Sequence, residues 1–215
     1  HLDVHHDDVG PGELRLVRSG GIAVITIDRA PVRNALDWAT MDAFGAAVRA
    51  LGADGAPGLR AVVVAGAGEQ AFCAGGDQRA LAGHESLADG ERLAGGMTDA
   101  LAGLEALPVP VIAAINGHAL GGGAEIAVAC DLRVVDAAVR FGMVQLRLGL
   151  TPGWGAGQRL MRLVGYGKAL ELFLRAEPLD AAELVALGLV AEVAPAGQAL
   201  PAAMATARRI AAADG

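Results

Sequence analysis

Aromatic residues are scarce in this chain of 215 residues, in which Phe, Trp and Tyr together make up 3%. A hydrophobic core must therefore be built mainly from Ala, Val, Leu and Ile, and few rings are present to stack on nucleic-acid bases. Apolar residues nevertheless reach 53% and charged residues only 19%, a balance that excludes global disorder. The length suits one domain, or one domain with an appendage.

Positive charge is also limited, and the formal net charge is −7 at pH 7. This balance argues against a general partner of nucleic acid or of an anionic membrane. Only two cysteines are present, Cys73 and Cys130, and the chain starts without an apolar targeting segment, which together predict reduced thiols in a cytoplasmic protein. No apolar run approaches the roughly 18 residues of a membrane helix, because Glu125 interrupts the longest one.

Residues 1–12 are polar and end at a Gly-Pro-Gly sequence. We expect them to form a flexible N-terminal tail. Their histidines and aspartates are residue types that bind metal ions, but a mobile polar tail is the favoured interpretation of such a segment. The sequence therefore predicts no metal site.

Hydrophobic periodicity divides the rest of the chain into alternating strands and helices. Residues 13–18 and 21–28 flank Ser19-Gly20-Gly21, which predicts an opening hairpin. Later strands are predicted at 59–65, 111–115, 132–136 and 189–193, and helices at 38–51, 98–107, 158–164, 168–174, 181–187 and 196–213. A weaker helical region, interrupted by glycines, is predicted before residue 98. Asp37 and Asp180 are the predicted N-caps of two of these helices. This order predicts an α/β fold with mainly parallel crossovers.

Three consecutive glycines, at 121–123, organise the middle of the chain. They follow the apolar run at 111–115 and precede an apolar segment, 126–130, that suits a buried helix. Glycines fit where a ligand must approach the main chain closely, here at a helix start whose first amides have no intrahelical partner. Such amides can hold an anion or a developing oxyanion. Glu125, in the first turn, is either a catalytic carboxylate or an ordinary residue that complements the helix dipole.

A second glycine pair, Gly75-Gly76, follows the apolar strand predicted at 59–65. Ligand sites in parallel sheets lie beyond the carboxyl ends of the strands. If the two strands are neighbours, one amide from each glycine-rich loop would form a two-donor oxyanion hole. The alternative, a dinucleotide-binding loop at 66–71, is disfavoured because the glycine pair falls where the helix of that motif should run.

Residues 71–77 (AFCAGGD) and 116–125 (NGHALGGGAE) resemble the paired signatures of the crotonase family, the enoyl-CoA hydratase/isomerase group. The resemblance extends over about residues 13–213. It implies an α/β fold, a crotonase-like spiral of ββα units with a helical C-terminal region. It also implies acyl-CoA thioester substrates, whose carbonyl oxygen the amides of Gly76 and Gly122 would hold while an enolate forms.

The same resemblance implies further site residues. Seven positions would border the CoA moiety or the thioester: Arg33, Ala35, Ala74, Asp77, Gln78, His118 and Gly121. Arg33 is equally well interpreted as a solvated surface arginine. The resemblance implies that no cofactor is needed, since CoA enters as part of the substrate. It also implies that the protein forms a homotrimer or a dimer of trimers. It makes residues 13–195 the acyl-CoA-binding core and residues 196–215 the start of a C-terminal helical region that is incomplete beside the family.

The reaction depends on two positions at which hydrating family members commonly carry glutamates. Glu125 occupies the first of them, and Gln145, twenty residues later (145 − 125 = 20), occupies the second. A glutamine can orient water but has no titratable proton at neutral pH. The resemblance and these two residues together predict enoyl-CoA hydratase/isomerase chemistry with a single catalytic glutamate.

Two alternatives stay open. A decarboxylase of alkylmalonyl-CoA thioesters needs the oxyanion hole more than a second base, and the turn at 152–155 is similar to that of ethylmalonyl-CoA decarboxylase relatives. An acyl-CoA-binding member with little or no catalysis is the other. The helix start favours the ionised form of Glu125 and apolar surroundings disfavour it, so the sequence leaves its protonation state open.

Overall fold

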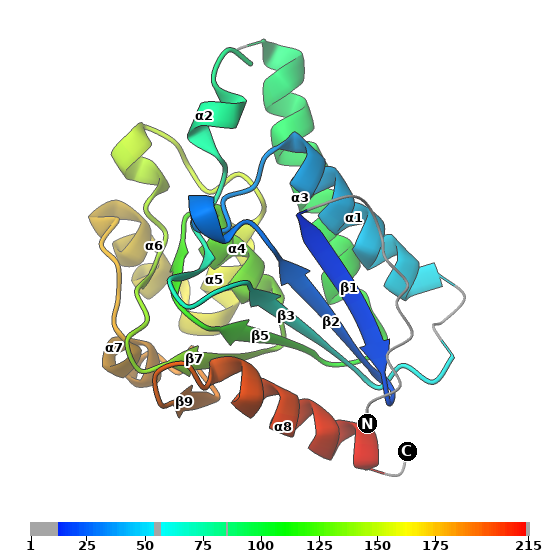
Figure 1. The fold of residues 1–215 in the computed structure, drawn as a ribbon. Coiled ribbons are helices and arrows are strands. Elements are labelled where there is room, and N and C mark those ends of the chain that lie inside the picture. The colour runs from blue at the N-terminus through cyan, green and yellow to red at the C-terminus, as the bar shows by residue number, and fades with distance from the viewer. Residues whose placement is uncertain (1–12, 54–56, 85, 214–215) are drawn as a thin grey trace.

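The computed structural model describes residues 13–53, 57–84 and 86–213 (Figure 1). The predicted N-terminal tail, at 1–12, lies outside the described residues. Within the described part of the chain, the strands form two sheets. The larger sheet has the strand order β1-β2-β3-β5-β7-β9, and the smaller sheet has the order β4-β6-β8.

The larger sheet opens with the predicted hairpin, in which β1 (Leu14–Ser19) and β2 (Ile22–Ile27) pair antiparallel. The later strands pair parallel with their neighbours, as predicted: β3 (Ala61–Gly66), β5 (Val111–Ile115), β7 (Leu132–Asp136) and β9 (Glu192–Ala194). Strand β9 begins later than the predicted residue 189. The reason is local, because the amide of Leu189 bonds back to the carbonyl oxygen of Leu184 at 2.9 Å.

The smaller sheet consists of short parallel strands that the sequence pattern does not predict: β4 (Ala71–Cys73), β6 (His118–Leu120) and β8 (Phe141–Gly142). Strands this short contain too few residues to show a period of two. Each follows a strand of the larger sheet in the chain and precedes a helical segment. This repeated order of two strands and a helix confirms the spiral of ββα units.

Two predicted helix starts are confirmed by their caps. The Asp37 carboxylate accepts a hydrogen bond from the Thr40 amide at 2.8 Å, and Asp180 forms a capping box with Glu183. The helices of the described residues are η1 (Ala30–Val32), α1 (Trp38–Gly52), α2 (Gln78–Leu81), α3 (Leu87–Glu105), α4 (Gly122–Ala129), η3 (Gln145–Leu148), α5 (Ala156–Val164), α6 (Tyr166–Arg175), α7 (Ala181–Ala186) and α8 (Ala199–Ala212).

Helix α3 begins at Leu87, so the region before residue 98 that the sequence predicts as only weakly helical is part of one continuous helix. A capping box fixes this start: Ser86 Oγ accepts from the Asp89 amide, and Asp89 Oδ2 accepts from the Ser86 amide, both at 3.1 Å. Glycines in the first half of the helix each lower its helix propensity by about 1 kcal/mol. Packing against α1 supplies the stabilisation that the local sequence does not.

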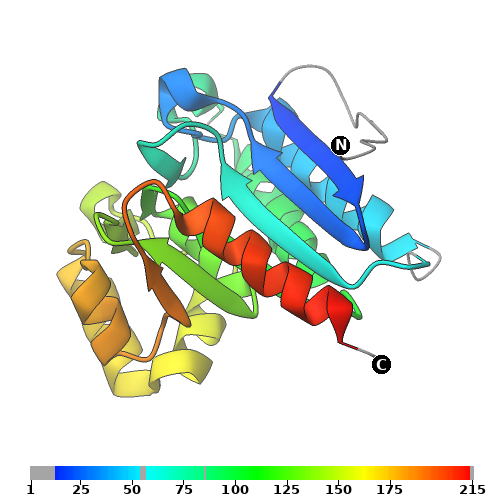
Figure 2. The same cartoon turned by 60° about the horizontal axis from the view of Figure 1, so that its bottom comes forward.

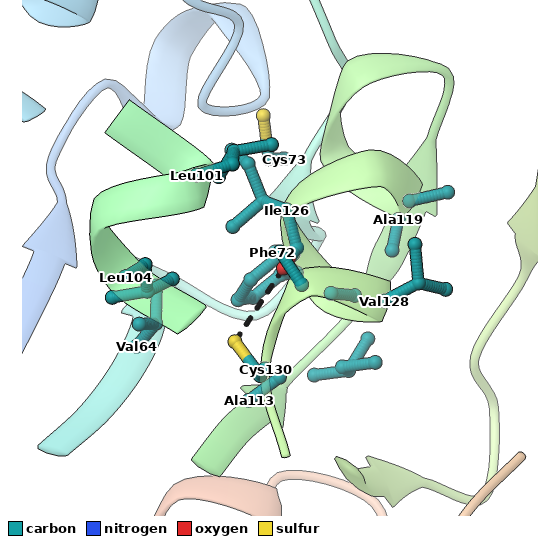
Figure 3. Close-up of a cluster of buried hydrophobic side chains, with 14 of the residues drawn as sticks. Val64, Phe72, Cys73, Leu101, Leu104, Ala113, Ala119, Ile126, Val128 and Cys130 are labelled. Carbon is teal, nitrogen blue, oxygen red and sulfur yellow. Dashed lines mark hydrogen bonds between the residues drawn. The ribbon is translucent and has the colours of Figure 1, made fainter. Parts of the chain in front are cut away.

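The main core fills the space between one face of the larger sheet, the smaller sheet and helices α1, α3, α4 and α5. Figure 3 shows part of this cluster, in which Val64 of β3, Leu104 of α3 and Ile126 of α4 lie together. Cys73 and Cys130 are free and buried here, and burial raises the pKa of each thiol to about 12. Both cysteines are therefore protonated core residues at neutral pH.

A smaller core lies on the opposite face of the larger sheet, under α8 (Figure 2). Ala203 and Ala207 of this helix are fully buried against the strands. The last predicted helix therefore covers one face of the sheet.

Over residues 13–53, 57–84 and 86–213, no helix combines the length and the hydropathy needed to cross a membrane. The same residues contain no cluster of three or more His, Cys, Asp or Glu side chains suited to a metal ion.

Candidate active site

The two glycine-rich loops meet at the carboxyl ends of neighbouring strands. Strand β3 pairs with β5, and β4 pairs with β6, both in parallel. A Cβ atom built on Gly75 would lie 3.0 Å from the amide nitrogen of Gly122, so the two loops are in direct contact. Gly76 and Gly122 line one cavity. The structure therefore places the two loops next to each other, which the sequence analysis had to assume.

This cavity, called the Glu125 cavity below, has a volume of about 380 Å³. The predicted site residues that line it are Ala74, Gly76, Gln78, Gly121, Gly122, Glu125 and Gln145. Its apolar walls come from α2, α3, η3 and the turn before α5, and include Leu81, Leu93, Leu148, Leu150 and Trp154. Glu125 is the one carboxylate among the described residues that line it.

The start of α4 accepts only glycine because it is packed on two sides. A Cβ atom at Gly122 would lie 2.1 Å from the ring of Trp154, and one at Gly123 would lie 2.0 Å from the carbonyl oxygen of Cys73. Gly122 is the first residue of the helix, so its N–H has no intrahelical acceptor. Within the part of the chain that the structure describes, the amides of Gly76 and Gly122 donate no hydrogen bond.

Glu125 is 2% exposed and accepts three hydrogen bonds. Its Oε1 accepts from Gln145 Nε2 at 3.0 Å, and its Oε2 accepts from the amides of Trp154 at 2.8 Å and Ala156 at 3.2 Å. Burial raises the pKa of Glu125 above its ordinary value, and the amides of Ala156 and Trp154 at the start of α5 oppose that rise. The three hydrogen bonds therefore hold the carboxylate in a defined position, while burial and the amide donors shift its pKa in opposite directions.

Gln145 lies at the start of η3 and is 9% exposed. A carboxylate oxygen can only accept, so the amide nitrogen of Gln145 faces Glu125. Its Oε1 is buried and has no hydrogen-bond partner among the described residues. A buried acceptor without a partner is costly, and it suits a donor that arrives with a ligand.

Trp154 contributes more to the site than the sequence predicts. Its ring lies against Gly122, its main-chain N–H binds Glu125, and the whole residue is only 5% exposed. The signal in the sequence was the turn at 152–155 before a predicted helix. The free amides at that helix start bind Glu125 because α5 packs against α4. No local sequence pattern predicts this packing.

Arg33 and His118 lie elsewhere, on a second cavity of about 480 Å³ that Asn116 and Asp136 also line. We call it the Asp136 cavity. It lies where β5 and β7 end, and Glu125 is not among its lining residues. Neither Arg33 nor His118 lines the Glu125 cavity, although the main chain of Arg33 accepts a hydrogen bond from the amide of Ala74, which does line it, at 3.1 Å.

Two more predicted positions, Asp77 and Ala35, are engaged by the protein itself. The Asp77 carboxylate caps α2 by accepting from the amides of Arg79 and Ala80, each at 3.2 Å, and pairs with Arg29 at 3.1 Å. Arg29 also donates to the carbonyl oxygen of Ala35 at 2.5 Å. These contacts give Asp77 a role in holding the loop that carries Gly75 and Gly76.

Comparisons with known proteins identify relatives of this chain. The family model for enoyl-CoA hydratase/isomerase matches residues 17–214. The chain is 37% identical over 195 residues to the short-chain-enoyl-CoA hydratase of Clostridium acetobutylicum, which covers 91% of this chain and 74% of that protein. It is 39% identical over 191 residues to the crotonyl-CoA hydratase of Syntrophomonas wolfei, with 88% of this chain and 72% of that protein covered.

Solved structures show the same fold. DspI of Pseudomonas aeruginosa has a TM-score of 0.89 at 32% identity, covering 98% of this chain and 78% of that one. An enoyl-CoA hydratase from Bacillus anthracis has a TM-score of 0.87 at 33% identity, covering 93% and 77%. The fold thus defines a mixed α/β enzyme built on the ββα spiral. The chain belongs to the enoyl-CoA hydratase/isomerase family, which is the crotonase family.

Proposed function

We propose that this chain acts on acyl-CoA thioesters through an enolate, as an enoyl-CoA hydratase/isomerase with Glu125 as its single catalytic carboxylate. The proposal rests mainly on one observation. The amides of Gly76 and Gly122, which donate no hydrogen bond among the described residues, line the same cavity as one buried carboxylate. The substrate class comes from the relatives, which are named as hydratases of short-chain enoyl-CoA and of crotonyl-CoA.

The amides of Gly76 and Gly122 would bind the thioester carbonyl oxygen. Both stand in fixed surroundings: Leu36 bonds to the residues on either side of Gly76 at 2.8 Å, and the ring of Trp154 packs on Gly122. Donors that are already in place need no reorganisation as negative charge develops on the oxygen. Loss of one such donor typically costs about 3 kcal/mol of transition-state stabilisation.

Glu125 would move protons in both directions. In hydration, its carboxylate takes a proton from water while the water oxygen bonds to the β-carbon, and the displaced electron pair forms the enolate. Glu125 then returns that proton to the α-carbon. In isomerisation, the proton leaves the α-carbon and returns at the γ-carbon. Burial and amide hydrogen bonds shift the pKa of Glu125 in opposite directions, which suits a group that must both accept and release a proton.

Gln145 would orient the oxygen that adds to the substrate. With its nitrogen committed to Glu125, its free Oε1 can accept a hydrogen bond from a water molecule or from a β-hydroxyl group. This arrangement would hold the oxygen beside the carboxylate that exchanges its proton. Gln145 would therefore position the reacting oxygen and leave the proton transfer to Glu125.

A second candidate reaction is decarboxylation of an alkylmalonyl-CoA thioester. One observation favours it: apart from Glu125, the described lining of the cavity carries no carboxylate and is largely apolar. The bond between the α-carbon and the carboxylate would break, its electron pair would form the enolate, and protonated Glu125 would deliver a proton to the α-carbon. An ionised Glu125 would repel such a substrate, so hydration or isomerisation is our first proposal.

A panel of thioesters separates these reactions. Crotonyl-CoA, a 3-enoyl-CoA and methylmalonyl-CoA are incubated with the protein, and absorbance of the conjugated thioester and release of carbon dioxide are followed. Loss of absorbance with crotonyl-CoA supports hydration, its gain with the 3-enoyl-CoA supports isomerisation, and carbon dioxide release supports decarboxylation. Binding of crotonyl-CoA in calorimetry without turnover of any thioester would overturn the proposal in favour of a binding protein.

Gln145→Glu sharpens the assignment within that panel. If hydration is limited only by the missing second carboxylate, this variant should hydrate crotonyl-CoA faster than the wild type. Gln198→Glu, the same change at an exposed side chain outside the Glu125 cavity, is the matched control and should behave as the wild type. The expectation of no cofactor stays part of the proposal and is checked by turnover after dialysis. A homotrimer or a dimer of trimers also stays part of it, checked by light scattering.

A further inference from the structure

One buried cation lies behind the Glu125 cavity and takes no part in the chemistry proposed above. Arg159 of α5 is 7% exposed. Its Nη1 donates to the carbonyl oxygen of Trp154 at 2.5 Å, and its Nη2 pairs with Glu105 of α3 at 2.7 Å. The buried Nε of Arg159 has no partner among the described residues. Burial of a guanidinium is unfavourable unless its charge and its donors are matched, so the contacts of the other two nitrogens indicate what Arg159 does here.

Arg159 holds the turn whose main-chain amides donate hydrogen bonds to Glu125. The carbonyl of Trp154 accepts from Arg159, while the N–H of the same residue donates to Glu125. Gly155, the next residue, has a φ of +90°, and a Cβ atom there would lie 2.6 Å from Arg159 Nη1. The guanidinium therefore packs directly on the main chain that runs from Trp154 to the second donor, Ala156.

The partner of Arg159 connects this turn to another wall of the cavity. Glu105 lies in the last turn of α3, whose earlier residues Leu93 and Ala94 line the Glu125 cavity. The ion pair thus joins α3 to the start of α5. No side chain of α5 caps its own N-terminus. The orientation of its first amides then depends on Glu125 on one side and on Arg159 on the other.

We infer that Arg159 and Glu105 form a positioning pair that holds the amides of Trp154 and Ala156 against Glu125 and thereby sets the protonation of this carboxylate. The inference rests on the proposed role of Glu125 as the base. Hydrogen bonds to the ionised form favour it, so a relaxed turn would leave Glu125 protonated up to a higher pH. Arg159 touches no reacting atom in this arrangement and acts only through the turn.

The test compares four variants. Arg159→Met removes the pair, and Arg159→Met with Glu105→Leu replaces both partners by apolar side chains, which avoids an unpaired charge and protects folding. Arg159→Lys keeps the positive charge but replaces the planar guanidinium with a single ammonium group. Arg162→Met, at an exposed position of the same helix, is the control. The readouts are kcat, KM and the pH profile with crotonyl-CoA, together with a titration of the Glu125 carboxylate by carbon-13 NMR.

Arg159→Met and the double variant should lower kcat about tenfold to hundredfold with little change in KM, because misplaced donors affect the reacting geometry. The acid limb of the pH profile and the NMR titration of Glu125 should both move to higher pH. Arg159→Lys should recover part of the loss, and Arg162→Met should match the wild type.

A purely structural role gives a different result: a lower melting temperature for Arg159→Met, with the acid limb and the Glu125 titration unchanged in the folded double variant. That result would overturn the inference. Failure of the proposed function appears separately, as undiminished turnover in Glu125→Gln. In that case the NMR titration, which needs no turnover, still decides whether Arg159 controls the protonation of Glu125.

Discussion

Two buried carboxylates of this chain make similar contacts in different surroundings. Glu125 accepts from amides at the start of α5, at 2.8 and 3.2 Å. Asp136 accepts from three amides at the start of α8, at 2.8 to 3.1 Å. Each carboxylate lines a cavity. Burial and helix capping alone therefore do not distinguish a catalytic carboxylate from a structural one.

The neighbours of the two carboxylates differ. In the Asp136 cavity, the side chain of Asn116 uses both its oxygen and its nitrogen in bonds to the main chain of Gly66 and Gly68. In the Glu125 cavity, the Oε1 of Gln145 has no partner among the described residues, and neither do the amides of Gly76 and Gly122. The candidate active site is thus distinguished by donors and an acceptor that have no partner in the described part of the chain and lie beside a carboxylate fixed by hydrogen bonds.

The largest expected effect tests the two carboxylates with the same chemical change. Glu125→Gln should lower turnover of crotonyl-CoA by at least about 10³-fold, because the amide cannot take a proton. Asp136→Asn is the matched control and should keep turnover close to that of the wild type. Steady-state kinetics on both purified variants measures the difference. An equal loss of activity in the two variants would remove the distinction between the cavities.

The converse effect on stability is expected at Asp136. Asp136→Ala leaves three amides at the start of α8 without their acceptor and should lower the free energy of unfolding by about 2 kcal/mol. Asp180→Ala, at the more exposed cap of α7, should cost less, about 1 kcal/mol. Urea unfolding measures both values. If Asp136→Ala were as stable as the wild type, the capping role would be wrong.

A smaller effect concerns pH. Because burial raises the pKa of Glu125 above the ordinary value of 4.5, the folded chain keeps this proton at pH values where the unfolded chain releases it. The free energy of unfolding should therefore fall as the pH rises from 4.5 through the raised pKa. Glu125→Gln lacks this dependence, so its stability relative to the wild type should increase over that range. Urea unfolding at several pH values would show a constant difference if the pKa were not raised.

The smallest effect is expected at His118. This side chain is exposed on the Asp136 cavity, so His118→Ala should change the free energy of unfolding by less than about 0.5 kcal/mol and leave KM for crotonyl-CoA nearly unchanged. Titration calorimetry with crotonyl-CoA checks the binding directly. A clear rise in KM would instead favour the contact with CoA that the family resemblance implies.

The sequence pattern found those candidate residues of the Glu125 cavity that lie together in one short segment of the chain. Gly121, Gly122 and Glu125 lie within one helix start, and the glycine pair at 75–76 follows one strand, so their patterns were visible without a fold. Trp154 and Arg159 were not predicted as site residues, because each contributes through a contact between helices that are distant in the sequence. For Asp77, the contacts with Arg29 and with α2 give a role within the fold that no pattern indicated.

The elements follow the same rule. Strands with continuous apolar runs, such as β3 and β5, were predicted nearly at their observed bounds. The strands of the smaller sheet were missed because two or three residues carry no period, and they are stabilised by pairing with one another. The first half of α3 was predicted only as a weaker helical region because its glycines disfavour helix locally, while its capping box and its packing on α1 favour it.

The sequence by itself determined the class of fold, the glycine-rich loops and the acidic residue beside them, because hydrophobic period and glycine content act over a few neighbouring residues. Only the tertiary structure decided which polar groups remain free. That outcome depends on the partners that distant segments offer: α5 and Gln145 for Glu125, α8 for Asp136, and α3 for Arg159. A hydrogen bond between distant residues leaves no periodic trace in the chain, so this selection appears only once the chain is folded.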